Sequence, residues 1–379
     1  MSRFFAVVSK PARDMAAHFP GPAASPKPTP TAAQPQLIRL DSNENPFGPS
    51  PRAIEAMRSA LATQNFYPDD DSTELRRRLA LHHQVSQEQI LVTAGSTEML
   101  ALLCQTMLAP GLNAVTSERS FIIYSMAVHA TGAQFIQSPM RGEVFALDAI
   151  RAAINQNTRI VFLANPNNPT GTMLEATAID EFLTNIPAHV VVVLDEAYYE
   201  FAVHFAALRK LQYSRSLEYL QRGANVIVLR TFSKAHGLAG LRVGYGLGPA
   251  DLLTYCARMR NPFSVSSVAQ AAAIAALDDH DHIARVVSSN ASQAQILTHG
   301  LSEMGHRVVP TSANFLYCDV REEASRIAAC LGDEGVSVRP LRAWGSPNSI
   351  RVSIGTPEQN EFFLSAMRKI GGRSQRTQR

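Results

Sequence analysis

The chain has 379 residues, of which 46% are hydrophobic, and its formal net charge is +3. This size supports more than one packed unit, so we expect a large domain plus a smaller one. The low charge and the lack of a long basic run argue against a nucleic-acid partner. No segment reaches transmembrane length without polar interruption, which argues against a membrane partner. The cysteines lack CxxC spacing and predict core thiols in a reducing, cytoplasmic compartment, not disulfides or a metal site: Cys104, Cys256, Cys318 and Cys330.

The first 36 residues are rich in proline, with six prolines between Pro20 and Pro35. Such a composition predicts an extended, poorly ordered arm over residues 1–36. The apolar burst Phe4–Val8 is too short for the apolar region of a signal peptide. A targeting role for this arm stays open.

Strand-like and helix-like segments alternate from residue 37 to residue 265. Ser50-Pro51 has the composition of a helix start, and a helix over 97–108 follows a short strand at 90–93. This alternation predicts an α/β large domain with a mostly parallel sheet covered by helices. Its N-terminal segment is expected to contribute to the small domain and to a dimer. The further predicted strands of the large domain are 160–164, 190–194, 226–229 and 243–247.

Beyond residue 265 the pattern changes, and residues 266–379 are predicted to form a smaller C-terminal α/β domain. An alanine-rich helical region begins at Val268, and a helix over 357–370 follows the last strand. The predicted strands are 314–320, 336–339 and 349–354.

Lys234 is one of only five lysines, against thirty arginines. It follows the apolar run Val226–Leu229, which predicts a strand buried on both faces. Burial near such a strand end would lower the pKa of the amine and favour attack on carbonyl groups. Taken alone, the position is better explained by a lysine whose ammonium reaches solvent from the strand end.

Polar turns follow several of the predicted strands. Gly95–Glu98 joins a strand to a helix, and its free N–H groups and hydroxyls could hold a phosphate, although simple capping would explain it too. Asn165–Gly171 contains two Asn-Pro steps, which predict a rigid turn at the edge where α/β sheets bind ligands. Asp195 ends the strand at 190–194, where its carboxylate could hold a protonated ring nitrogen or merely cap the next element. Ser233 and Arg242 flank Lys234 and suit phosphate.

In this order, these motifs resemble the fold-type-I enzymes that use pyridoxal 5'-phosphate (PLP), and within them the histidinol-phosphate aminotransferases. The resemblance covers roughly residues 38–370, and its most specific motifs are Asn165–Gly171 and Thr231–Tyr245. Asp41–Gly48 and Tyr67–Asp69 are similar to N-terminal signatures of the same subgroup. The resemblance implies PLP as cofactor, transamination as the activity and a homodimer with shared active sites.

The resemblance also implies a role for each matching residue. Lys234 would form the Schiff base with the cofactor and shuttle the proton, and Asp195 would pair with the pyridinium nitrogen. Asn168 and Tyr198 would hydrogen-bond the phenolic oxygen, and Phe121 would stack on the ring. The phosphate would be held by Ser96, Thr97, Ser233 and Arg242, with Tyr67 reaching it from the neighbouring subunit. Substrate would be bound by Arg339, Arg351 and Asn43.

Two departures from the family pattern stand out. Phe121 replaces a tyrosine and loses its hydroxyl, but stacking needs only the aromatic face. The usual acidic residue of the phosphate-binding turn is replaced within Gly95–Glu98, which affects details of cofactor anchoring.

The expected reaction converts L-histidinol phosphate and 2-oxoglutarate into imidazole-acetol phosphate and glutamate. Arg339 matches the position that contacts the substrate phosphate in this subgroup, although a surface arginine on an edge strand would also explain it. An aromatic or broad-range aminotransferase is the main competing function, since fold and cofactor do not specify the substrate. A PLP-dependent decarboxylase of a phosphorylated amino acid and a non-enzymatic effector domain compete less strongly.

Overall fold

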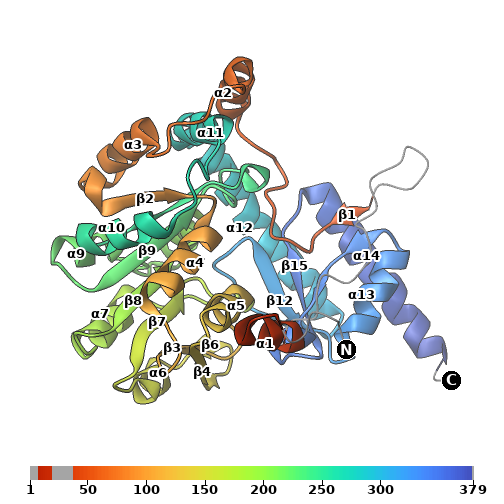
Figure 1. The fold of residues 1–379 in the computed structure, drawn as a ribbon. Coiled ribbons are helices and arrows are strands. Elements are labelled where there is room, and N and C mark those ends of the chain that lie inside the picture. Colours follow the sequence, from red (N-terminus) through yellow and green to blue (C-terminus); the bar gives the residue numbers. More distant parts are fainter. Residues whose placement is uncertain (1–6, 19–36, 378–379) are drawn as a thin grey trace.

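The computed structural model describes residues 7–18 and 37–377, which form two α/β domains (Figure 1). The large domain is built on a seven-stranded sheet in which β9, β8, β7, β3 and β4 are parallel neighbours. β10 runs antiparallel to both of its neighbours, β2 and β9. The predicted α/β class with a mostly parallel sheet is confirmed. In spatial order the strands are β2 (Ile90–Thr93), β10 (Gly244–Leu247), β9 (Val226–Thr231), β8 (Val191–Asp195), β7 (Thr158–Ala164), β3 (Asn113–Ser117) and β4 (Gln134–Ser138).

The central strands are continuous apolar runs because helices cover both faces of the sheet. Every residue of β8 and β9 is buried. Ser50 begins the first helix of this domain as predicted, since its hydroxyl accepts the Ala53 N–H at 3.1 Å. The helices are α2 (Pro51–Ala60), α3 (Thr73–His83), α4 (Ser96–Met107), α5 (Ile122–Ala130), α6 (Leu147–Ala153), α7 (Ala176–Thr184), α8 (Tyr199–Arg209), α9 (Ser216–Gln221), α10 (Ala250–Met259) and α11 (Ser267–Leu277).

The small domain, drawn mostly in blue in Figure 1, contains a four-stranded antiparallel sheet and its own core. The sheet order is β11 (Arg307–Val309), β12 (Phe315–Asp319), β15 (Ser349–Ser353) and β14 (Arg339–Pro340). Its helices are α12 (His280–Glu303), α13 (Ala324–Asp333) and α14 (Pro357–Thr377). The N-terminal strand β1 (Ile38–Arg39) pairs with β13 (Val336–Ser337) and so joins this domain.

The buried face of α11, which follows the predicted domain boundary at residue 265, packs with Ala53 in the large core. Two expectations need correction. The single strand predicted at 336–339 is divided between β13 and β14, which belong to different sheets. The arm is not extended throughout, since Lys10–His18 form the helix α1 beside α5. Residues 1–6 and 19–36 of the predicted arm lie outside the described residues.

Candidate active site

One cavity of about 350 Å³ collects the predicted site residues at the junction of the two domains. Its wall combines the carboxyl-end turns of the large sheet with Arg339 and Arg351 of the small domain and with the segment Ser42–Glu44. Of the predicted residues, only Tyr67 is missing from this wall. The residues brought together are Asn43, Ser96, Thr97, Phe121, Asn168, Asp195, Tyr198, Ser233, Lys234, Arg242, Arg339 and Arg351.

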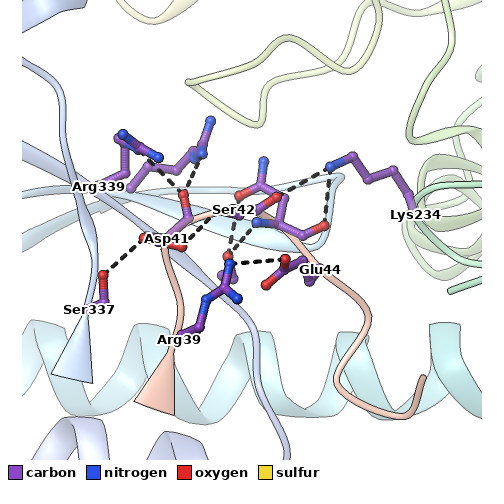
Figure 2. A network of polar contacts seen from close by, with 10 residues as sticks. Arg39, Asp41, Ser42, Glu44, Lys234, Ser337 and Arg339 are labelled. Carbon is purple, nitrogen blue, oxygen red and sulfur yellow. Dashed lines mark hydrogen bonds and ion pairs between the residues drawn. The ribbon is translucent and has the colours of Figure 1, made fainter. Parts of the chain in front are cut away.

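Lys234 lies in the turn after β9, and its side chain points into the cavity toward the N-terminal segment (Figure 2). Its ammonium donates to the backbone oxygens of Ser42 and Asn43, at 3.4 and 3.2 Å. Burial lowers the pKa of this amine to about 8, and the nearby positive charges of Arg351 and Arg242 act in the same direction. With this pKa roughly a tenth of the amine is neutral and nucleophilic at pH 7, far more than for an exposed lysine.

Asp195 ends β8, one strand away from Lys234, and its side chain is buried. Tyr124 donates its hydroxyl to Oδ2 at 2.7 Å, and the Ala197 N–H donates to Oδ1 at 3.2 Å. Burial raises the pKa of the carboxyl to about 6, while these two donors oppose the increase. The carboxylate is therefore a charged hydrogen-bond acceptor that is largely shielded from solvent.

An anion cradle lies at the start of α4. Gly95 precedes this helix with a positive φ of 79°, and Ser96 and Thr97 occupy its first turn. The Arg242 guanidinium covers the same turn, because a Cβ built on Gly95 would lie 2.6 Å from Nη2. Arg242 also donates to the Ser233 hydroxyl at 3.3 Å. A helix N-terminus, hydroxyls and an arginine together favour a phosphate.

The remaining wall of the large domain carries aromatic and amide groups. Phe121 meets the edge of the Tyr124 ring, with centroids 5.6 Å apart. Tyr198 is buried, and its hydroxyl accepts a hydrogen bond from the Asn43 amide at 2.8 Å. Asn168, in the turn with the predicted Asn-Pro steps, accepts a hydrogen bond from Arg351 Nη1 at 2.6 Å. The turn thus contacts the small domain directly.

Arg339 and Arg351 form the small-domain side of the cavity. They are direct cross-strand partners on β14 and β15, and both donate to the backbone oxygen of Asp41, at 3.5 and 2.9 Å. Burial lowers the pKa of Arg351 to about 10, and the charge of Arg339 adds to this effect. Arg351 Nε is buried and has no hydrogen-bond partner. Like charges placed opposite each other are unfavourable unless an anion lies between them, so this pair suits an anionic group.

The segment from Arg39 to Glu44 lies between Lys234 and Arg339 (Figure 2). Asp41 is bound by the Ser337 hydroxyl at 2.9 Å, and Glu44 pairs with Arg39 at 3.2 Å. The sequence motif assigned a role only to Asn43, so Ser42 and Glu44 were missed as cavity residues. Tyr124 was missed as well, although its three-residue spacing from Phe121 could have indicated a shared helical face.

Tyr67 lies on the surface, away from the cavity. Its side chain is 82% exposed and stacks on Phe263, with ring centroids 4.6 Å apart. Phe66 and Leu61 nearby are also exposed. Within one chain Tyr67 therefore cannot take part in this site.

Residues 7–18 and 37–377 contain no group of three or more histidine, cysteine or acidic side chains arranged to hold a metal ion. Over the same part of the chain, no helix combines the length and apolar character needed to cross a bilayer. The four cysteines are free thiols, and all but Cys330 are fully buried.

A family model described as aminotransferase class I and II matches residues 35–367. The chain belongs to the class I and II aminotransferases. A histidinol-phosphate aminotransferase 2 from Pseudomonas aeruginosa is 42% identical over 371 residues, covering 98% of this chain and 99% of the relative. One from Pseudomonas fluorescens is 44% identical over 334 residues, covering 88% and 89%. The resemblance inferred from the motifs is confirmed.

Solved structures agree with this assignment. Histidinol-phosphate aminotransferase from Sinorhizobium meliloti, solved in complex with pyridoxal-5'-phosphate, has a TM-score of 0.82. It is 27% identical to this aminotransferase, and the match covers 98% of both chains.

Proposed function

We propose that this aminotransferase uses PLP to convert L-histidinol phosphate and 2-oxoglutarate into imidazole-acetol phosphate and L-glutamate, a step of histidine biosynthesis. The names of relatives that match it over nearly the whole chain support this substrate. The observation that carries the proposal is a second cluster of positive charge in the cavity, which would suit an anion. Arg339 and Arg351 lie opposite each other there, apart from the cradle at α4, and Arg351 Nε lacks a partner.

The residues present fit PLP. The glycine at position 95 leaves room for Arg242 against the start of α4, and a Cβ built on Gly244 would lie 2.7 Å from the Ser96 N–H nitrogen. The cofactor phosphate would take this cradle, with Thr97 and Ser233 as further donors. When bound, PLP withdraws electrons from the carbon that carries the substrate's amino group.

The chain's own residues would orient the cofactor and move the proton to and from the reacting carbon. Lys234 would hold the cofactor covalently and then, as a free amine, carry a proton to and from the reacting carbon. Asp195 would keep the ring nitrogen protonated through a buried, charge-assisted hydrogen bond. Asn168 and Tyr198 would donate to the ring oxygen, and Phe121 would pack on the ring face.

The small-domain arginines would bind the substrate's anion. Histidinol phosphate has a phosphate and no carboxylate, whereas glutamate has two carboxylates. Planar guanidinium groups suit both anions, which a single site must accept in turn. Asn43 would bind the substrate, and its hydrogen bond to the Tyr198 hydroxyl would hold the Asn43 side chain in position.

We also propose a homodimer with shared sites in the cytoplasm. The dimer proposal rests on the exposed aromatic surface of Tyr67, Phe66 and Phe263, which a second copy could cover. In such a dimer Tyr67 would donate to the partner's cofactor phosphate. The free thiols fit a reducing compartment.

A half-reaction screen tests the proposed substrate. Purified enzyme loaded with PLP is mixed with single amino donors, and the loss of the cofactor's absorbance is followed. We expect histidinol phosphate to react with the highest kcat/KM. A preference for phenylalanine or tyrosine would favour an aromatic aminotransferase, and release of CO₂ from a phosphorylated amino acid would favour a decarboxylase.

A further inference from the structure

Tyr124 lies on the first turn of α5, and its side chain is fully buried. The ring stacks on Phe162 of β7, with centroids 4.6 Å apart and planes only 7° from parallel. This packing orients the hydroxyl, which donates to Asp195 Oδ2 at 2.7 Å. Both Tyr124 and Asp195 line the cavity.

We propose that Tyr124 is a positioning residue whose hydrogen bond to Asp195 keeps the shared proton on the cofactor's ring nitrogen and off the carboxyl oxygen. The inference rests on the role proposed for Asp195. It adds a residue on α5 that acts through Asp195.

The surroundings of Asp195 show why a donor is needed there. Burial favours the neutral carboxyl, and the adjacent Glu196 acts in the same direction. The groups that favour the carboxylate are the Tyr124 hydroxyl, the Ala197 N–H and the charge of Lys234. If Lys234 held the cofactor, its free ammonium would no longer act on Asp195, and the hydrogen bonds from Tyr124 and Ala197 would remain.

Tyr124 remains a donor throughout the working pH range. Burial and the nearby Asp195 raise the pKa of its phenol well above the ordinary value, so the hydroxyl keeps its proton. Tyr198, the second phenol near this carboxylate, has its hydroxyl hydrogen-bonded to Asn43. Without Tyr124 the Asp195 carboxylate becomes more basic, competes for the proton and leaves the ring more neutral and less electron-withdrawing.

The test is Tyr124→Phe, which keeps the aromatic ring and its stacking on Phe162. The enzyme is loaded with PLP labelled with ¹⁵N in the ring, and the nitrogen chemical shift is recorded against pH. In the wild type we expect a protonated ring nitrogen. In Tyr124→Phe we expect the shift to move toward the value of a neutral pyridine, with roughly tenfold weaker cofactor binding. The loss of activity should appear in kcat and leave the KM for substrate nearly unchanged.

Tyr245→Phe is the matched control. Tyr245 is also a buried phenol in the same sheet, and its hydroxyl lies 2.8 Å from His83 Nε2, away from the cavity. We expect its ¹⁵N shift and cofactor affinity to match the wild type. Equal ¹⁵N shifts in Tyr124→Phe and wild type would overturn the inference.

Asp195→Asn separates this inference from the proposed function. If the wild-type ring nitrogen is protonated and Asp195→Asn removes the proton, the role of Asp195 holds, and the Tyr124→Phe result decides the inference alone. If Asp195→Asn leaves the ¹⁵N shift of the wild type unchanged, the role of Asp195 fails, and the inference fails with it.

Discussion

Arg339 and Arg351 stand opposite each other on β14 and β15 and donate to the same backbone oxygen, that of Asp41. The two contacts differ in quality. The Arg351 hydrogen bond is 2.9 Å long, and its side chain is buried, whereas Arg339 Nε lies 3.5 Å from the oxygen. Arg339 can therefore leave this oxygen with little loss of interaction free energy and bind an incoming anion. Arg351 is held in place by its shorter hydrogen bond.

Arg339→Ala should reduce kcat/KM for histidinol phosphate by about 30- to 1,000-fold, because one buried charge-assisted contact contributes about 2–4 kcal/mol. Phenylalanine has no distal anion, so its kcat/KM should change far less. Arg342→Ala is the control, since the Arg342 side chain is 72% exposed and pairs with Glu323. Equal losses for both substrates in Arg339→Ala would contradict the proposed anion site.

Borohydride reduction of the loaded enzyme, followed by peptide mapping, should place the pyridoxyl group on Lys234. Lys210 is the natural comparison, because it ends α8 in an exposed position. Lys234→Ala should remove the label and the activity together. Recovery of the label on Lys210 would refute the assignment.

Cofactor capture by the cofactor-free protein should accelerate with pH around a midpoint near 8. Burial lowers the pKa of Lys234 to about 8, so raising the pH through this value releases the neutral amine that attacks the aldehyde. Stopped-flow absorbance after addition of PLP measures the rate. A midpoint near 10, as for an exposed lysine, would contradict the buried-amine interpretation.

Asp195→Asn should keep the fold and lose activity by about a hundredfold or more, since a neutral amide cannot hold the ring nitrogen protonated. The circular dichroism spectrum should match the wild type, which separates a catalytic effect from unfolding. Near-normal turnover by a folded Asp195→Asn protein would exclude the proposed role.

If the sites are shared, mixing the Tyr67→Phe protein with the Lys234→Ala protein should restore part of the aminotransferase activity. Each hybrid dimer then has one site with both the intact lysine and the partner's intact tyrosine. Sedimentation at the assay concentration gives the oligomeric state. An active wild-type monomer would rule out the shared-site dimer.

Sequence patterns predicted the central strands well, because buried parallel strands are continuous apolar runs. β2 spans the predicted residues, and β7, β8 and β9 lie within a few residues of theirs. β3 and β4 were missed, since Asn113–Ser117 and Gln134–Ser138 mix polar with apolar residues. The buried polar groups of β3 are satisfied by partners distant in sequence, such as the Phe162 oxygen that accepts the Thr116 hydroxyl.

The sequence by itself determined which reactive groups lie at the sheet edge, because Lys234, Asp195 and Arg242 each follow a strand or turn with a recognisable local pattern. Tertiary structure alone decided how these groups meet. The contact of Tyr124 with Asp195 joins residues 71 positions apart, and the pairing of Arg339 with Arg351 depends on strand register. The segment around Asp41 acquires its place only when β1 pairs with β13. Such contacts depend on packing between distant parts of the chain, which local periodicity does not encode.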